Sequence, residues 1–306
     1  MAQPALSRYI HADVLARVGQ LEFVPRGLVE GTLAGSHRSP FHGFAIEFAG
    51  HRQYAPGDDL RHLDWRVFFR SRRYVIKQYE METNLVCHIA LDASASMRYG
   101  EGEQNKLAYA SRIAATLAYL VIEQRDRTSM SVFTDQLIAR LPASNSPSQL
   151  IRLTGLLEGT EAADKTSLAR PLLELAAGAG RRSIVVLLTD AYGDLGELDA
   201  ALQRLRFDRH EIVVFQVLHR DEIRFDLPGL IRFVGLEEDV SLIARPDDIR
   251  RQYLAAFEAH QKALADVCHA NQAEWVVAPT DRPLADLLAD YLQSRLAFAG
   301  RSMAAR

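Results

Sequence analysis

Two hydrophobic runs that each lead to an aspartate constrain this chain most strongly. Residues 85–91 read LVCHIAL and precede Asp92, while residues 184–188 read IVVLL and precede Thr189 and Asp190. Short apolar runs of this kind are typical of strands buried on both faces of a sheet. Ligand sites in open α/β sheets lie beyond the carboxyl ends of such strands. We therefore expect a polar site where these two strands end.

The rest of the sequence after residue 84 alternates between the two kinds of secondary structure. Apolar residues recur at helical spacing, and further short apolar runs predict strands. The predicted helices cover residues 107–121, 150–157, 168–175, 195–205, 246–270 and 284–292, and the predicted further strands cover 129–133, 137–141, 212–218 and 274–278. This alternation predicts an α/β fold over residues 84–306, with a doubly wound, mostly parallel sheet and helices on both faces.

Residues 1–83 have a different character. They are rich in Gly, Pro, Arg and aromatic residues, and residues 12–21 form their only clear amphipathic stretch. Residues 44–48 and 74–79 have the composition of strands, separated by turn-forming residues at Pro56, Gly57 and Asp58. We expect a β-rich N-terminal attachment rather than a second core.

Composition narrows the functional class. The formal net charge of −3 gives no electrostatic reason to expect binding to nucleic acid or to an anionic membrane. Two cysteines cannot form a disulfide framework, and no apolar run has the length of a membrane span or of a signal-peptide core. These features predict a cytoplasmic protein.

The residues around the two predicted strand ends offer hard oxygen ligands. Asp92, Ser94 and Ser96 are spaced by two along one loop, and Asp190 ends the second strand. Thr166 precedes a predicted helix and offers a third hydroxyl. Two carboxylates with three hydroxyls suit Mg²⁺ or Mn²⁺, whereas Zn²⁺ prefers nitrogen and sulfur. We interpret these five residues as a candidate metal site, although Ser and Asp also gather in such loops as helix caps.

This pattern resembles the metal-ion-dependent adhesion site (MIDAS) of von Willebrand factor A (vWA) domains, which is D-x-S-x-S followed by Thr and then Asp. Asp92, Ser94 and Ser96 match in full, and Asp190 matches by its place after a hydrophobic strand. Thr166 departs from the pattern, because Lys165 stands where the family usually has Gly, and Ser167 is a neighbouring candidate.

Residues 52–82, RQYAPGDDLRHLDWRVFFRSRRYVIKQYEME, sharpen the comparison. They resemble the signature of the "domain of unknown function 58" family, Y-x-P-G-D-D-x-R-x-x-D-W followed by R-x-(Y/F)-E-x-E. The resemblance implies a vWA-like fold and genetic pairing with MoxR-type AAA+ ATPases, in chaperone-like systems that mature or remodel other proteins. This chain looks like a short form without transmembrane helices.

The resemblance leads to one functional hypothesis and leaves alternatives open. We expect a metal-dependent protein-protein interaction module, an adaptor or accessory factor of a MoxR-type ATPase, in which a carboxylate of the ATPase or of a client protein binds the metal. A metal-dependent, phosphatase-like hydrolase is the alternative, although the sequence has no G-x-S-x-G or Walker A element. A vWA-like module without a working metal site is the third possibility.

The signature segment itself supports two interpretations. Its charged residues either tie the attachment together or form a recognition surface, and we favour the structural role. A basic stretch over residues 61–77 has interleaved aromatic residues, Phe68, Phe69 and Tyr74, which suit single-stranded nucleic acid. In strand geometry these aromatics would instead enter the core, so we expect no nucleic-acid binding.

Overall fold

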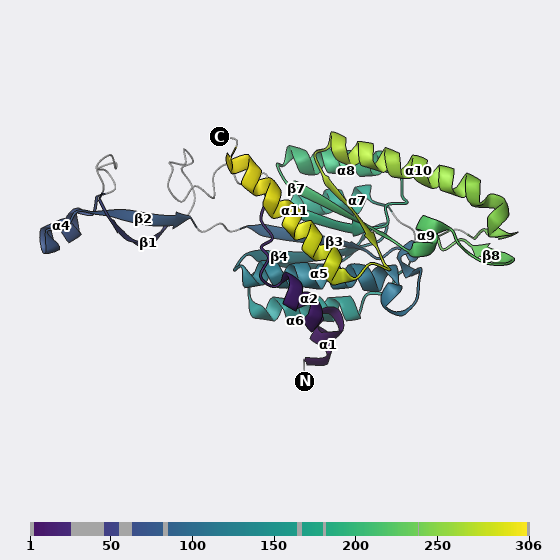
Figure 1. Ribbon diagram of the computed structural model, residues 1–306, viewed down its shortest axis with the longest axis horizontal. Coiled ribbons are helices and arrows are strands. Elements are labelled where there is room, and N and C mark those ends of the chain that lie inside the picture. The colour runs from purple at the N-terminus through teal and green to yellow at the C-terminus, as the bar shows by residue number, and fades with distance from the viewer. Residues whose placement is uncertain are drawn as a thin grey trace. The chain divides into compact units, whose positions relative to one another are not determined.

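The computed structural model describes residues 3–25, 46–54, 63–81, 85–163, 167–179, 182–237 and 239–304. They fall into two compact units, one made of residues 1–26 and 85–306 and the other of residues 27–84. The larger unit is an α/β domain, and Figure 1 shows its layers.

A six-stranded sheet forms the centre of the larger unit. Its strands are β3 (Val86–Asp92), β4 (Arg127–Phe133), β5 (Leu137–Ser144), β6 (Ile184–Thr189), β7 (Glu211–Leu218) and β10 (Glu274–Pro279). Their order is β10-β7-β6-β3-β4-β5, and only the edge strand β5 is antiparallel to its neighbour. The chain leaves β3 toward β4 and later returns to its other side with β6, so the strand order reverses between β3 and β6. The predicted doubly wound, mostly parallel sheet is confirmed.

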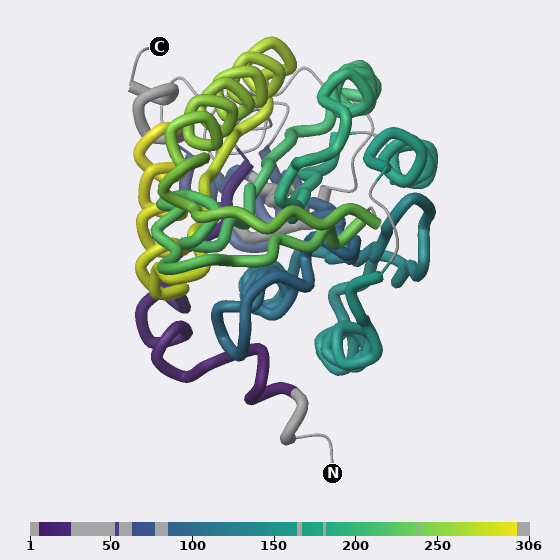
Figure 2. Tube along the Cα trace, turned by 90° about the vertical axis from the view of Figure 1, so that its right-hand side faces the viewer, coloured from purple at the N-terminus to yellow at the C-terminus, as the bar shows by residue number. Residues whose placement is uncertain are grey.

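Helices cover both faces of this sheet. One layer contains α5 (Lys106–Glu123), α6 (Pro147–Glu158) and α11 (Leu284–Ala304), and the other contains α7 (Ala169–Gly178), α8 (Leu195–Phe207) and α10 (Pro246–Ala270). Figure 2, viewed from one end, shows α8 and α10 above the sheet and α5 and α6 below it. The predicted covering of both faces is confirmed.

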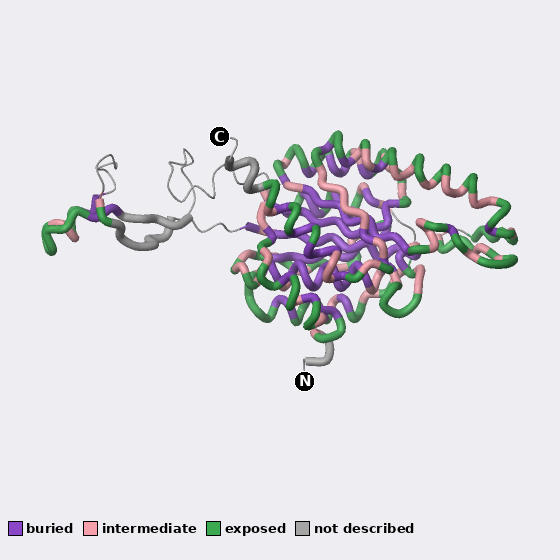
Figure 3. Tube along the Cα trace, viewed as in Figure 1, coloured by how far each residue is buried: buried purple, intermediate pink, exposed green. Residues whose placement is uncertain are grey.

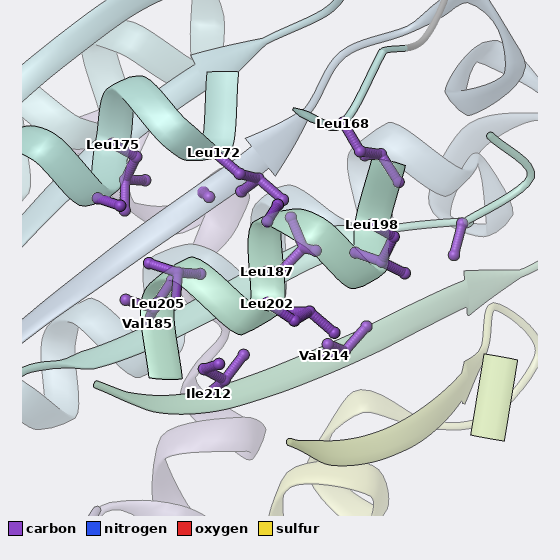
Figure 4. Close-up of a cluster of buried hydrophobic side chains, with 14 of the residues drawn as sticks. Leu168, Leu172, Leu175, Val185, Leu187, Leu198, Leu202, Leu205, Ile212 and Val214 are labelled. Atoms are coloured by element: carbon purple, nitrogen blue, oxygen red, sulfur yellow. The ribbon is translucent and has the colours of Figure 1, made fainter. Parts of the chain in front are cut away.

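The core lies between these layers. All six residues of β6 are buried, as expected for a central parallel strand, and Figure 3 shows the buried strands through the middle of the domain. Between α7, α8 and the sheet, Leu172, Leu202 and Val214 belong to one packed cluster (Figure 4). Burial of each such leucine contributes about 1.5–3 kcal/mol.

Residues 3–25 pack on the α/β domain. Helix α1 (Gln3–Tyr9) contacts α5 and α6, and α2 (Ala12–Val18) contacts α11. Phe23 is buried against Tyr291 of α11. We predicted one attachment over residues 1–83, whereas the second compact unit begins at Gly27. The sequence could not show this because the packing partners lie far along the chain, as for Val24 and Arg295, which are 271 residues apart.

A hairpin beyond β7 was not predicted. Helix α9 (Arg220–Arg224) follows β7, and the two-stranded antiparallel hairpin of β8 (Ile231–Val234) and β9 (Ser241–Ala244) precedes α10. Phe225, at the end of α9, stacks between Phe233 of β8 and Tyr253 of α10. Strands of four residues are too short to be recognised from the alternation of apolar and polar residues.

The smaller unit contains an antiparallel pair, β1 (Ile46–Gln53) and β2 (Val75–Met81), and the short helix α4 (Trp65–Ser71). Asp64 begins this helix, because its Oδ1 accepts hydrogen bonds from the backbone N–H groups of Arg66 and Val67. Our prediction of strand geometry for the basic stretch was therefore wrong over α4. The expected burial of its aromatics was also wrong, since Phe69 is 72% exposed and Tyr74 52%. Signature residues 55–62 lie outside the described residues.

Candidate metal site at the carboxyl ends of β3 and β6

The two predicted carboxylates lie at neighbouring strand ends. Asp92 is the last residue of β3, and Asp190 directly follows β6. The two strands are parallel neighbours, with Leu91 opposite Leu188, so both aspartates reach the same edge of the sheet at the point where strand order reverses. Both are fully buried.

Of the two predicted serines, Ser94 contacts Asp92 and Ser96 contacts Ser94. Beyond β3 the chain forms a short turn and the 3-10 helix η2 (Ala95–Arg98). The backbone N–H of Ser94 donates to Oδ1 of Asp92 over 2.9 Å, which turns the loop back toward the carboxylate. The Oγ atoms of Ser94 and Ser96 are 3.0 Å apart. Ser94 is fully buried whereas Ser96 is partly exposed, so the hydroxyl pair reaches from the interior to the surface.

Thr166 lies outside the described residues. The neighbouring candidate Ser167 is described, and its Oγ donates to Oε2 of Glu197 over 3.0 Å. Ser167 is therefore engaged with α8 in this structure.

Thr189 is a contributor that sequence reasoning missed. Its Oγ1 donates to Oδ2 of Asp92 over 2.6 Å and accepts a hydrogen bond from the backbone N–H of Ala191. Ala191 adopts a left-handed conformation with φ of 57°, which costs a non-glycine residue about 1–2 kcal/mol. Such strained positions gather at functional sites. A lone hydroxyl at the end of the otherwise apolar run IVVLLT was the available signal.

Lys106 was also missed, and it is the first residue of α5. Its fully buried ammonium donates to Oδ2 of Asp190 over 2.7 Å and to Oε1 of Glu222 in α9 over 2.8 Å. The ring of Tyr192 lies 5.4 Å from Nζ. A cation at the first position of a helix opposes the helix dipole, so this lysine after the capping residue Asn105 was a readable anomaly.

Burial controls the ionisation of these groups. Burial, and secondly the charge of Asp190, raise the pKa of Asp92 far above its usual value. Burial likewise raises the pKa of Glu222. Burial opposes the charged form of Lys106, but the Asp190 and Glu222 carboxylates outweigh it and raise its pKa. The edge of the sheet therefore favours added positive charge, and Lys106 supplies one unit of it.

The donor set fits a small hard cation. Neighbouring ligands of an octahedral Mg²⁺ at about 2.1 Å are about 3.0 Å apart, which matches the Ser94 and Ser96 hydroxyls. Asp92 and Asp190 add oxygens, and Asp92 keeps lone pairs beyond its two hydrogen bonds. Among the described residues, no three His, Cys, Asp or Glu side chains form a metal-binding group, so any ion here depends on hydroxyl ligands.

The strand order, the antiparallel edge strand and this carboxylate–hydroxyl edge together define a vWA-like domain. Residues 50–263 match the family model described as "Protein of unknown function DUF58". The chain belongs to this family. The relatives include uncharacterized protein Rv1480 of Mycobacterium tuberculosis and uncharacterized protein Mb1516 of Mycobacterium bovis. Each is 25% identical over 285 residues, covering 91% of this chain and 87% of the relative.

Solved structures with a related fold include the conserved hypothetical protein BatB from Bacteroides thetaiotaomicron, at 15% identity and a TM-score of 0.45. That match covers 70% of this chain and 99% of BatB. The SpRpn10 VWA domain matches at 10% identity and a TM-score of 0.38, covering 67% of this chain and 94% of that domain. In the part of the chain that the structure describes, no helix is both long and apolar enough to cross a membrane.

Proposed function

We propose that this chain is a protein-interaction module in which Mg²⁺ or Mn²⁺, held by Asp92, Ser94, Ser96 and Asp190, with Thr166 as the fifth proposed ligand, binds a carboxylate of the partner. The observation that carries the proposal is the meeting of two buried aspartates and a pair of hydroxyls 3.0 Å apart at one edge of the sheet. When bound, the ion would supply a positive centre with a position free for an anionic ligand.

Most of the proposed ligands are buried, so a partner could reach the ion from one side only. Asp92, Ser94 and Asp190 are fully buried, so a partner would approach from the partly exposed Ser96. Ser94 hydrogen-bonds to Asp92 through its backbone N–H and to Ser96 through its hydroxyl, and Lys106 donates to Asp190. With the ion bound, this arrangement would give a partner's acidic side chain one place to bind.

We propose that the partner is a MoxR-type AAA+ ATPase or one of its client proteins, and that the chain acts as an adaptor in protein maturation or remodelling. The support is the resemblance of its signature to families paired with such ATPases. Because Mg²⁺ prefers charged oxygen ligands, we propose that the partner binds the ion through a carboxylate and not through a neutral group.

Co-purification of the chain with the candidate ATPase tests this proposal. Binding should fall in EDTA, return with Mg²⁺, and fall in Ser94→Ala and Ser96→Ala, which remove hydroxyl ligands without changing charge. Ser148→Ala is the matched control, because Ser148 is an exposed serine in α6, remote from this edge in the fold. Undiminished binding in EDTA by a correctly folded protein would refute metal-dependent recognition.

A further inference from the structure

Lys106 places a positive charge beside the candidate metal site, in contact with one of its proposed ligands. Its ammonium is fully buried and lies 2.7 Å from Oδ2 of Asp190 and 2.8 Å from Oε1 of Glu222. Counting Asp92, this cluster sets one ammonium against three carboxylates. It therefore lacks two positive charges when all its acids are ionised, and one divalent cation would supply them.

The second partner of Lys106 is fixed independently of the first. Glu222 is held in place because its Oε2 accepts a hydrogen bond from the backbone N–H of His219 over 2.6 Å. Its own backbone carbonyl accepts a hydrogen bond from the hydroxyl of Tyr253 in α10. Glu222 would thus keep the ammonium in place if Asp190 were withdrawn from it.

We propose that Lys106 is an intramolecular counter-ion that competes with the divalent cation for Asp190, so that metal binding transfers Asp190 from the ammonium to the ion while Glu222 retains the lysine. This inference rests on the proposed metal site and adds how its affinity is set. Metal affinity is then held down by a charge in the protein itself. The site is poised to fill only when the ion, or the ion with a partner carboxylate, outcompetes Lys106.

If the Lys106 ion pair were purely structural, its removal would change metal affinity differently. If Lys106 only ties α5 to the strand end, its removal weakens the fold and leaves metal affinity unchanged or reduced by disorder. If it competes, its removal strengthens metal binding, because two carboxylates lose their internal cation. The direction of the change in metal affinity separates the two roles.

Titration calorimetry with Mn²⁺ alone should compare the wild type with Lys106→Met and Lys106→Arg. Methionine is an unbranched, uncharged side chain of nearly the same length, and we expect the dissociation constant of Lys106→Met for Mn²⁺ to be at least about tenfold lower than that of the wild type. Arginine keeps the charge, and we expect its affinity to stay within about threefold of the wild type. Binding by Lys106→Met but not by the wild type would be the strongest form of the same result.

Equal or weaker binding by a folded Lys106→Met protein would overturn the competition and leave the metal site standing. Absence of Mn²⁺ binding in all three proteins would overturn both the competition and the proposed function. The two failures are therefore distinguishable.

A measurement on the wild type covers the case in which Lys106→Met fails to fold. The sequence contains four lysines, Lys77, Lys106, Lys165 and Lys262. In protein labelled with ¹⁵N-lysine, the ammonium signal absent from Lys106→Arg identifies Lys106. Saturating Mg²⁺ should shift this signal, because the ammonium loses one of its two carboxylate acceptors. An unchanged Lys106 signal at Mg²⁺ saturation would overturn the proposal.

Discussion

The two ends of the central sheet each bury one cation between two carboxylates, and they do so differently. At the amino ends of β7 and β10, Arg295 of α11 pairs with Glu211 and Glu274, the first residues of those strands. At the carboxyl ends, Lys106 pairs with Asp190 and Glu222. Both cationic side chains are almost completely inaccessible to solvent.

The arginine cluster is closed by the protein itself. Beyond its carboxylates, the guanidinium donates to the carbonyl of Val24 and to the hydroxyl of Tyr291, and the ring of Phe23 lies 4.7 Å from it. The lysine cluster instead borders Asp92 and the Ser94–Ser96 hydroxyl pair. The difference teaches that two cations with the same pair of carboxylate partners can have different surroundings. Under our proposal, only the one beside the candidate metal site can be displaced by another cation.

Removal of the arginine should have the largest effect on stability. Arg295→Met leaves the half-buried Glu211 and Glu274 without their cation, and we expect the free energy of unfolding to fall by about 3–5 kcal/mol. Urea unfolding measures the change. Arg170→Met is the matched control, because its exposed pair with Glu174 is worth only about 0.3–0.5 kcal/mol. If Mg²⁺ raised the free energy of unfolding of Arg295→Met more than that of the wild type, the distinction between the two ends of the sheet would be contradicted.

Lowering the pH should reduce the stability of the folded protein through His88, in the amino-terminal half of β3. His88 of β3 donates from Nε2 to the carbonyl of Ala179, and its Nδ1 contacts the hydroxyl of Ser129. Burial lowers the pKa of His88 to about 4 from 6.5. His88 therefore binds a proton below about pH 6.5 in the unfolded chain but only below about pH 4 in the folded protein. Stability present above pH 6.5 is lost across this window, by up to about 3 kcal/mol.

Unfolding in urea at several pH values, in EDTA, compares the wild type with His88→Gln, which cannot titrate. The variant should be less stable at pH 7.5 but should lose less stability between pH 6.5 and 4. Parallel pH profiles for the two proteins would show that His88 is not the group responsible.

Metal should act on the carboxyl end alone. At about 100 times its dissociation constant, Mg²⁺ or Mn²⁺ should raise the free energy of unfolding by about 2.7 kcal/mol. Arg295→Lys should keep this increment, since it alters only the amino end, whereas Asp92→Ala should lose it. A thermal-shift titration measures all three proteins, and equal responses in wild type and Asp92→Ala would remove Asp92 from the site.

The smallest effect is expected for Asp92→Asn in EDTA. Burial and the neighbouring charge of Asp190 disfavour the ionised form of Asp92, so loss of its charge should leave stability unchanged or raise it by up to about 1 kcal/mol. Asp190→Asn should instead destabilise the protein, because Lys106 then loses a buried partner. Equal losses in both variants would mean that Asp92 is as firmly paired as Asp190.

The sequence predicts the sheet well because its signals are local. The apolar run before Asp92 and the run before Asp190 are complete within seven residues, and the rule that sites follow strand ends places both carboxylates. Lys106 and Glu222 could not be placed in the same way. They reach the site from the beginnings of two helices, and their meeting depends on the packing of those helices on the sheet.

The errors on the N-terminal side have a related cause. Residues 65–71 are rich in aromatics, which favour strands, but the Asp64 side chain caps a helix there. The amphipathic stretch at residues 12–21 indicates a buried face, but it does not identify which helices of the distant domain pack against residues 3–25. Tertiary contacts therefore decide the structure where local preference is weak.

The bond between Arg295 and the carbonyl of Val24 has a consequence for synthesis of the chain on the ribosome. It joins residues 271 positions apart, so Val24 acquires this partner only when α11 has been made. Until then Phe23 lacks the aromatic and cationic neighbours that α11 provides. The domain is therefore incomplete until α11 has been translated, and nascent chains that stop before Arg295 should expose α2 and Phe23 to protease.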